Sequence, residues 1–140
     1  MLVVDASIAV KWYLSEEDTP QAIALFRQPF KLVAPPIIHL EVLSVLTKAA
    51  RKNKLEMAYT QTLINRWNSL LAQKALFLPE PEPGHQQAVS LSFTTGHTFY
   101  DCLYLSLAKH LHAPLATADT RQQTIARSLG IEIFGWQSTA

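Results

Sequence analysis

The stretch MLVVDASIAVKW, residues 1–12, decides the fold class. Its apolar residues 2–4 lead directly into Asp5, and apolar residues resume at Ile8. A run this short and this apolar is typical of a strand that is buried on both faces, as in a parallel sheet. A short helix is expected to follow from Ser7. Asp5 is therefore expected at the end of a buried strand, where a charge needs an explanation.

Strand-like and helix-like segments alternate along the rest of the chain. Further strands are expected over residues 31–36, 75–80, 113–119 and 131–136. Helices are expected over residues 16–28, 36–52, 55–74, 85–93, 98–111 and 120–130. This alternation predicts an α/β domain with a parallel sheet, and the consecutive helices in the middle predict a helical excursion beside it. The proline-rich stretch 77–85 is too short to divide two domains, so a single domain over residues 1–140 is expected.

Composition limits the classes of function. The 140 residues are 49% hydrophobic and 16% charged, which suits one domain with a sizeable core. A formal net charge of +1 creates no strong field that would attract nucleic acid or an anionic membrane, so a polyanion would need a local patch or a bound metal. No apolar run is long enough to span a bilayer, and no signal pattern opens the chain. A single cysteine, Cys102, fits a reducing compartment, so a cytoplasmic protein without a membrane partner is expected.

Four of the eleven acidic residues are embedded in apolar sequence: Asp5, Glu41, Asp101 and Asp119. Two of them end expected strands, and the other two lie in the first turns of expected helices. In a parallel α/β sheet, strand ends and the starts of the following helices share one edge, where ligands bind. All four carboxylates are therefore expected on the same rim of the molecule.

Each of these acids also has a purely structural interpretation. Asp5 and Asp119 suit the caps of the helices that follow them, and Asp101 lies three residues after Thr98, close to a capping-box arrangement. Glu41 suits an ion pair with a buried Arg or Lys. Taken together these interpretations weaken, because carboxylates gathered at one edge repel each other and burial increases that cost.

A divalent cation is the expected neutraliser, because Arg121 is the only basic residue beside any of the four acids in sequence. Mg²⁺ and Mn²⁺ favour carboxylate oxygens and water as ligands. A metal ion held this way can activate water and stabilise charge on a phosphate. The sequence has no Gly-rich phosphate loop, no Cys/His zinc spacing and no serine elbow.

Four motifs that contain these acids resemble the PIN domain, in particular the VapC-type toxins of bacterial type II toxin–antitoxin systems. The motifs are VVDASIAVKW (3–12), APPIIHLEVLSVL (34–46), TFYDCLYLSLAKHL (98–111) and PLATAD (114–119). The likeness runs from residue 2 to about residue 134. It implies a three-layer α/β fold with a parallel sheet of about five strands flanked by helices. It also implies a Mg²⁺-dependent endoribonuclease in which Mn²⁺ can substitute, a cognate antitoxin protein and a homodimer.

By position, four residues match the acidic quartet of that family, which implies catalytic and metal-binding roles for Asp5, Glu41, Asp101 and Asp119. The resemblance implies that Asp5 and Asp101 are direct metal ligands. Ser7 and Thr117 match small polar positions near the metal, where they would orient water or ligands. No further acid follows Asp119 within residues 120–126, where some relatives have one, so a second metal site is left open.

Two basic residues are candidates for contact with an RNA phosphate. Arg121 lies two residues after Asp119 at an expected helix start. Lys11 lies on the first helix, where a solvated position is the competing interpretation. The five histidines lack the spacing of metal ligands and are expected to be structural or surface residues.

Two other functions compete with RNA cleavage by a toxin. One keeps the fold but changes the substrate to DNA, or places the cleavage in RNA maturation. The other is a receiver-like phosphoacceptor domain, which has acids at strand ends and a nearby threonine. That fold needs a lysine at the end of its last strand, and residues 131–136 contain none.

Overall fold

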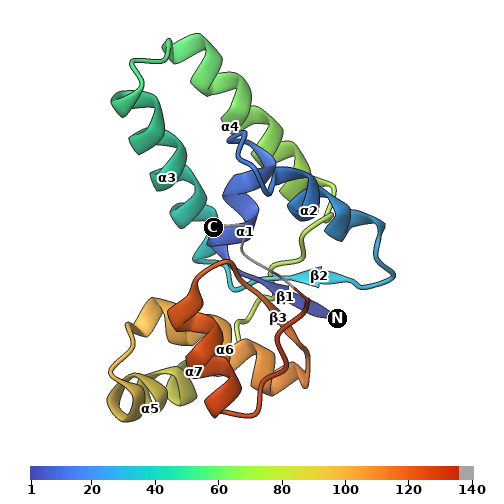
Figure 1. The fold of residues 1–140 in the computed structure, drawn as a ribbon, viewed down its shortest axis with the longest axis vertical. Coiled ribbons are helices and arrows are strands. Elements are labelled where there is room, and N and C mark those ends of the chain that lie inside the picture. The colour runs from blue at the N-terminus through green and yellow to red at the C-terminus, as the bar shows by residue number, and fades with distance from the viewer. Residues whose placement is uncertain (136–140) are drawn as a thin grey trace.

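The central element of the sheet is β1 (Leu2–Val4), whose three residues are fully buried. It pairs in parallel with β2 (Leu32–Val33) on one side and with β3 (Leu115–Ala116) on the other. A computed structural model of the chain describes residues 1–135 (Figure 1), so Trp136, which was expected to end the last strand, lies outside the described residues.

Two more segments extend this sheet through one residue each. Phe77 pairs in parallel with Val33, and Ile133 pairs in parallel with Leu115. The predicted α/β fold with a parallel sheet flanked by helices is confirmed. Of the about five strands expected, three are found within residues 1–135, and the expected strands 75–80 and 131–136 are each reduced to one bridging residue. Proline offers one reason on the first edge, because Pro79 and Pro81 have no N–H group to donate to a ladder.

Helices cover both faces of the sheet and form the outer layers. Figure 1 shows α1, α2 and α4 on one side and α5, α6 and α7 on the other, with α3 and α4 projecting away from the sheet as a hairpin. The α-helices are α1 (Ala6–Ala9), α2 (Thr19–Ala24), α3 (Ile38–Lys52), α4 (Met57–Ala72), α5 (His85–Thr95), α6 (Phe99–Leu111) and α7 (Thr120–Ser128). Short 3₁₀ segments, η1 (Val10–Trp12) and η2 (Leu25–Arg27), extend α1 and α2.

Glycine and proline mark the ends of two helices. Gly96 adopts a left-handed conformation at φ 71° and ends α5. The helix expected over residues 16–28 begins only at Thr19, with Pro20 in its first turn. Asp18 precedes that helix but its carboxylate makes no capping bond, because it pairs with Lys11 instead.

The core is continuous from the sheet into the helical layers. Trp67 of α4 and Tyr104 of α6 are its largest fully buried side chains, and α6 is buried along most of its length. None of the helices within residues 1–135 combines the length and the apolar character needed to cross a bilayer.

Candidate active site

The register of the sheet places Asp5 beside Thr117. Val4 pairs with Ala116, so both strands end at the same level, and the Asp5 N–H donates to the Ala116 carbonyl at 3.2 Å. Asp5 also caps α1, because its Oδ1 accepts hydrogen bonds from the Ser7 N–H at 3.0 Å and from the Ser7 hydroxyl at 2.5 Å. The capping role considered for this acid is therefore confirmed, at the strand edge where ligands of α/β sheets bind.

Hydrogen bonds through two small hydroxyl residues connect Asp5 to Asp119. Ser7 Oγ accepts the N–H of Ala118 at 2.9 Å and lies 3.3 Å from Thr117 Oγ1. Thr117 Oγ1 in turn accepts the Asp119 N–H at 3.1 Å. Ser7 and Thr117 thus lie between the two acids, and their role in orienting ligands stays a prediction.

Asp119 caps α7 as well as ending the segment after β3. Its Oδ1 accepts the backbone N–H groups of Arg121 at 2.8 Å and of Gln122 at 3.2 Å. Negative charge is favoured at a helix N-terminus, which stabilises this carboxylate without a basic partner.

Asp101 is held in the first turn of α6 by Thr98. The Thr98 hydroxyl accepts the Asp101 N–H at 3.2 Å and donates to Asp101 Oδ2 at 2.8 Å. Only the first bond is that of a capping box, because Asp101 accepts the hydroxyl hydrogen of Thr98 and not its backbone N–H. The Asp101 side chain stays 37% exposed, so it is accessible to a ligand.

Glu41 lies in the first turn of α3, and its partner comes from α6. Tyr104 donates its hydroxyl hydrogen to Glu41 Oε1 at 2.5 Å. The Arg or Lys considered as a partner for Glu41 is absent from the part of the chain that the structure describes. A hollow of about 340 Å³ opens beside this acid, lined by Ile37, Leu40, Glu41, Ser44, Val45 and Tyr100.

Tyr104 lies in a negatively charged environment. Burial raises the pKa of its phenol well above the usual range, and the negative charges of Glu41, Asp5 and Asp101 raise it further. The charges of Asp5, which follows β1, of Glu41 on α3 and of Asp101 on α6 thus act on one hydroxyl, and Glu41 contacts it directly. Asp119 joins this group through the bonds to Ser7 and Thr117 described above.

Two of these carboxyl groups lie where ionisation is disfavoured. Burial raises the pKa of Asp5 to about 6, although hydrogen bonds from Ser7 and Thr117 oppose that shift. Burial also raises the pKa of Glu41, with a smaller contribution from Asp101. Among residues 1–135, no Lys, Arg or His side chain forms an ion pair with Asp5, Glu41 or Asp119.

The four acids do not form a complete metal-coordination site in this structure. Within residues 1–135, no three His, Cys, Asp or Glu side chains are grouped so that they could hold a metal ion as they stand. Each carboxylate instead accepts hydrogen bonds from protein donors. Metal binding by this quartet therefore stays a prediction.

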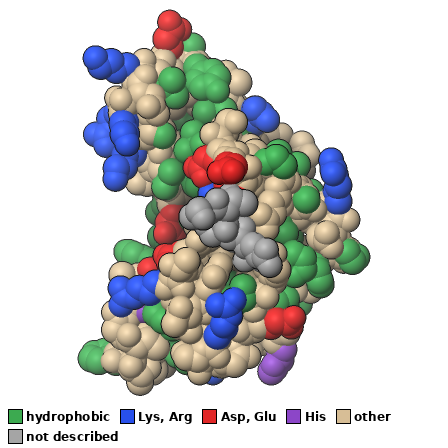
Figure 2. Space-filling model, viewed as in Figure 1, with side chains coloured by type: hydrophobic (Ala, Val, Ile, Leu, Met, Phe, Trp, Pro, Cys, Tyr) green, Lys and Arg blue, Asp and Glu red, His purple; other side chains and the backbone are tan. Residues whose placement is uncertain are grey.

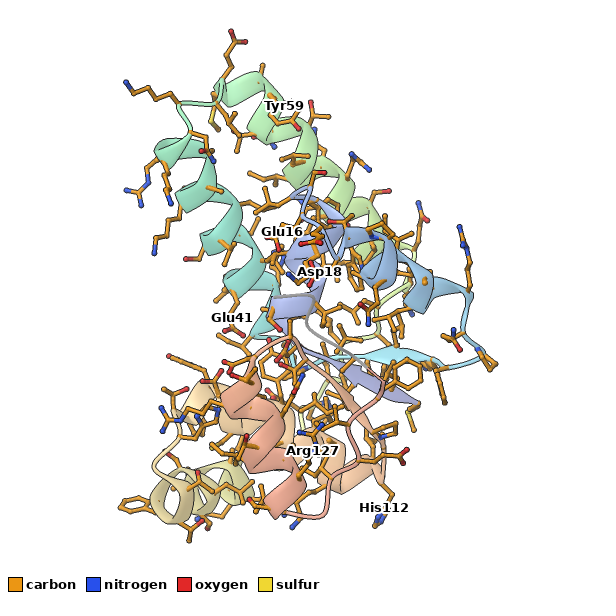
Figure 3. All side chains as sticks on the ribbon, in the orientation of Figure 1. Glu16, Asp18, Glu41, Tyr59, His112 and Arg127 are labelled. Atoms are coloured by element: carbon orange, nitrogen blue, oxygen red, sulfur yellow. The ribbon has the colours of Figure 1, made fainter. Side chains whose placement is uncertain are left out.

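Acidic side chains are visible on the surface around this region. Figure 2 shows them in the hollow at the waist of the molecule, between the α3–α4 hairpin and the lower helices. In Figure 3, Glu41 lies at the end of α3 nearest the sheet, and Glu16 and Asp18 lie beside α1.

The two candidate phosphate contacts differ in their surroundings. Arg121 is exposed, and its Nη2 lies 3.4 Å from the Gly96 carbonyl oxygen. Lys11 is only 9% exposed and pairs with Glu16 at 2.5 Å and with Asp18 at 3.0 Å. The solvated position considered for Lys11 is wrong, because the chain turns back after η1, which contains Lys11, and covers it with two carboxylates.

Sequence reasoning missed three residues beside the acids. Tyr104 follows Asp101 by one helical turn, which is a usable signal for a shared face. His97 directly precedes the Thr98 cap, but a lone histidine in a loop predicts nothing by itself. Gln122 is 1% exposed although it lies in the polar stretch TRQQT, and its pattern gives no sign of burial.

Comparisons with known proteins point to one family. The model of the family described as PIN domain matches residues 2–128. The VapC ribonuclease Mb0985 of Mycobacterium bovis and the Ribonuclease VapC9 of Mycobacterium tuberculosis are each 30% identical to this chain over 121 residues, which are 86% of this chain and 87% of theirs. The Ribonuclease VapC3 of Pyrobaculum aerophilum is 30% identical over 119 residues, 84% of this chain and 88% of that protein.

Two solved structures share the fold. PAE2754 from Pyrobaculum aerophilum has a TM-score of 0.67 at 20% identity and covers 91% of this chain and 90% of its own. FitAcB from Neisseria gonorrhoeae has a TM-score of 0.67 at 18% identity and covers 96% of this chain and 97% of its own. At such identities the likeness extends to the fold and no further.

Proposed function

Because the chain belongs to the PIN domain family, and its VapC relatives are named ribonucleases, we propose that it is a metal-dependent endoribonuclease of the VapC type. The reaction is hydrolysis of an RNA phosphodiester bond. In this role the protein is the toxin of a type II toxin–antitoxin pair.

The grouping of Asp5, Glu41 and Asp101 is the observation that carries the proposal. Glu41 accepts the hydroxyl hydrogen of Tyr104, which lies one turn after Asp101 on α6, and Asp5 directly follows β1, which packs against α6. These acids come from three separate elements, so their proximity is a product of the fold and not of local sequence. A fold gains no stability from gathering buried carboxylates without a counter-charge, because each raises the cost of ionising the others. The arrangement is therefore explained by a ligand that carries positive charge.

The donor set fits a hard divalent cation. It consists of carboxylate oxygens with hydroxyl groups behind them, and Mg²⁺ and Mn²⁺ prefer such oxygens. We assign Asp5 and Asp101 as direct ligands, with Glu41 and Asp119 completing the acidic site. When bound, the ion would act as a Lewis acid that activates water and stabilises negative charge on the phosphate.

The other side chains of the site would position the acids and the substrate. Ser7 and Thr117 fix the ends of β1 and β3 relative to each other, so they hold Asp5 and Asp119 in place. Thr98 fixes the Asp101 carboxylate from one side and leaves it open to solvent on the other. Arg121 is exposed directly after Asp119, where its guanidinium can hold a substrate phosphate.

Further parts of the proposal come from the likeness to VapC-type toxins. A cognate antitoxin protein would bind the toxin and block its site, two copies would form a homodimer, and the pair would act in the cytoplasm. Lys11 is a weaker candidate than Arg121 for RNA contact, because its ammonium group already pairs with two carboxylates.

One of the two competing functions is excluded and the other is kept. Membership of the PIN family sets aside the receiver-like domain. A PIN nuclease that acts on DNA, or in RNA maturation, uses the same acids and is separated from the toxin by its substrate alone.

Cleavage mapping on total RNA, with Mg²⁺ or with EDTA, tests activity, metal requirement and substrate together. The parent should cut RNA with Mg²⁺ and lose that activity in EDTA. Asp101→Asn should be inactive yet folded, because an Asn side chain can still accept the Thr98 hydrogen bond. Glu56→Gln is the matched control, because Glu56 is an exposed acid at the start of α4 and should cut like the parent. An Asp101→Asn variant as active as the parent would overturn the site.

A further inference from the structure

Two buried polar side chains, those of His97 and Gln122, lie between the first turns of α6 and α7. His97 is 4% exposed and Gln122 is 1% exposed. Neither belongs to the acidic quartet. Burying polar groups this completely is costly unless they are hydrogen-bonded. The hydrogen bonds of His97 and Gln122 therefore indicate their role.

Their hydrogen bonds form a directed chain. His97 Nε2 lies 2.5 Å from Gln122 Oε1, and Gln122 Nε2 donates to the backbone carbonyl of Asp101 at 3.1 Å. An amide oxygen only accepts, so the bond to Gln122 places the histidine hydrogen on Nε2. His97 Nδ1 is then an acceptor, and it is buried without a partner within residues 1–135.

Gln122 is bonded to Asp101 in the first turn of α6 and to Asp119, the N-cap of α7. Its side chain holds the Asp101 carbonyl, and its backbone N–H donates to Asp119 Oδ1 at 3.2 Å. His97 Nε2 also lies 3.6 Å from Asp101 Oδ2, so the imidazole packs against the Asp101 carboxylate. One residue therefore connects Asp101 to Asp119, and His97 fixes the orientation of that residue.

We propose that His97 and Gln122 are positioning residues that set the separation of the Asp101 and Asp119 carboxylates for metal binding. This inference rests on the proposed function. His97 acts through Gln122, because its Nε2–H selects the amide orientation in which Gln122 Nε2 faces Asp101. Without that donor, the amide can turn over and release the start of α6 from the start of α7.

Direct measurement of Mn²⁺ binding to the intact metal-free protein, by electron paramagnetic resonance of the free ion, tests this proposal. His97→Asn removes the donor at the Nε2 position, since its shorter amide reaches only as far as Nδ1. It should weaken Mn²⁺ binding by about 10- to 100-fold, the usual effect of losing a residue that orients metal ligands. His97→Gln reaches the Nε2 position and should restore most of the affinity.

Kinetics on an RNA oligonucleotide give a second readout. At a fixed Mn²⁺ concentration below saturation, His97→Asn should lower kcat and leave the KM for RNA close to that of the parent, because the change affects the metal site and not RNA contacts. Gln122→Met should weaken Mn²⁺ binding at least as much. The double variant should be no weaker than Gln122→Met alone, because His97 acts through that side chain.

The outcomes separate this inference from the proposed function. A parent that binds Mn²⁺ and cleaves RNA, beside a folded His97→Asn variant with the same Mn²⁺ affinity, overturns the inference alone. If His97→Asn does not fold, parent-like affinity in Gln122→Met overturns it equally. A parent that binds no Mn²⁺ overturns both.

Discussion

The hydroxyl of Tyr104 in α6 donates a 2.5 Å hydrogen bond to Oε1 of Glu41 in α3. These residues are 63 positions apart in the chain, and α3 belongs to the projecting hairpin whereas α6 belongs to the layer formed with α5 and α7. The bond therefore joins the α3–α4 hairpin to α6 at the acidic site. Because the phenol is buried and the carboxylate is half-buried, neither group can exchange its partner freely for water.

Replacing Tyr104 with Phe should destabilise the metal-free protein by about 1–2 kcal/mol, because a half-buried carboxylate loses its donor. The pKa of Glu41 should rise further, since the Tyr104 hydrogen bond opposes the effect of burial. Urea unfolding in EDTA at pH 8 measures the first effect, and a carboxyl NMR titration measures the second. Tyr59→Phe is the control, because Tyr59 is 54% exposed at the far end of the hairpin (Figure 3). Equal unfolding free energies for Tyr104→Phe and the parent would contradict this account.

Asp5→Asn should make the metal-free protein more stable above pH 6. The pKa of Asp5 is raised from 3.8 to about 6 in the folded state, so the folded state binds this proton more tightly than the unfolded state does. The stability that the protonated group supplies is fully present below about pH 4 and is lost as pH rises through 6. The shift corresponds to about 3 kcal/mol. Asn keeps an oxygen that can accept the Ser7 N–H, so the cap should survive.

Urea unfolding of both proteins in EDTA between pH 4 and pH 8 checks this prediction. The free energy of unfolding of Asp5→Asn should exceed that of the parent at pH 8, and the difference should shrink toward pH 4. Other titrating groups contribute equally to both proteins and cancel in the difference. A gap that stays constant across this pH range would show that Asp5 ionises normally.

Much of the fold was predictable because its signals are local. Alternating apolar strands and amphipathic helices lie in the sequence itself, and so do the caps at Thr98 and Asp119. The shared edge of the sheet then follows from the general geometry of parallel strands, which is why Asp5 and Asp119 were expected to meet. The register of Val4 with Ala116 bears this out.

The parts that sequence reasoning missed depend on tertiary packing. Gln122 is buried only because α7 packs against the start of α6, and the His97 contact spans 25 residues. The pairing of Lys11 with Glu16 and Asp18 spans only five and seven residues, but it depends on the reversal of the chain after η1. No hydrophobic period encodes such a reversal, so Lys11 was assigned to solvent.

Lys11→Met should lower stability without changing RNA binding, whereas Arg121→Gln should weaken RNA binding without changing stability. Lys11→Met leaves two carboxylates without their cation and should lower the unfolding free energy by about 1–3 kcal/mol, which is less than for a fully buried pair because Glu16 is 44% exposed. It should leave the KM for RNA unchanged. Arg121→Gln should leave stability unchanged, raise the KM, and reduce the slope of log affinity against log salt by about 0.7. A Lys11→Met variant with parent-like stability and weaker RNA binding would reverse the two assignments.

Mg²⁺ should raise the melting temperature of the parent, because a ligand that binds only the folded state stabilises it. At a concentration one hundred times its Kd, the gain is about 2.7 kcal/mol, or several degrees for a domain of this size. Asp101→Asn should show little of this shift because it loses a direct ligand, whereas Glu56→Gln should show all of it. Calcium-free and EDTA-treated protein is required, so that the starting state carries no divalent ion. The absence of any shift in the parent at saturating Mg²⁺ and Mn²⁺ would mean that the gathered carboxylates do not bind metal, and the explanation for Asp5 at the end of β1 would have to be sought in its cap alone.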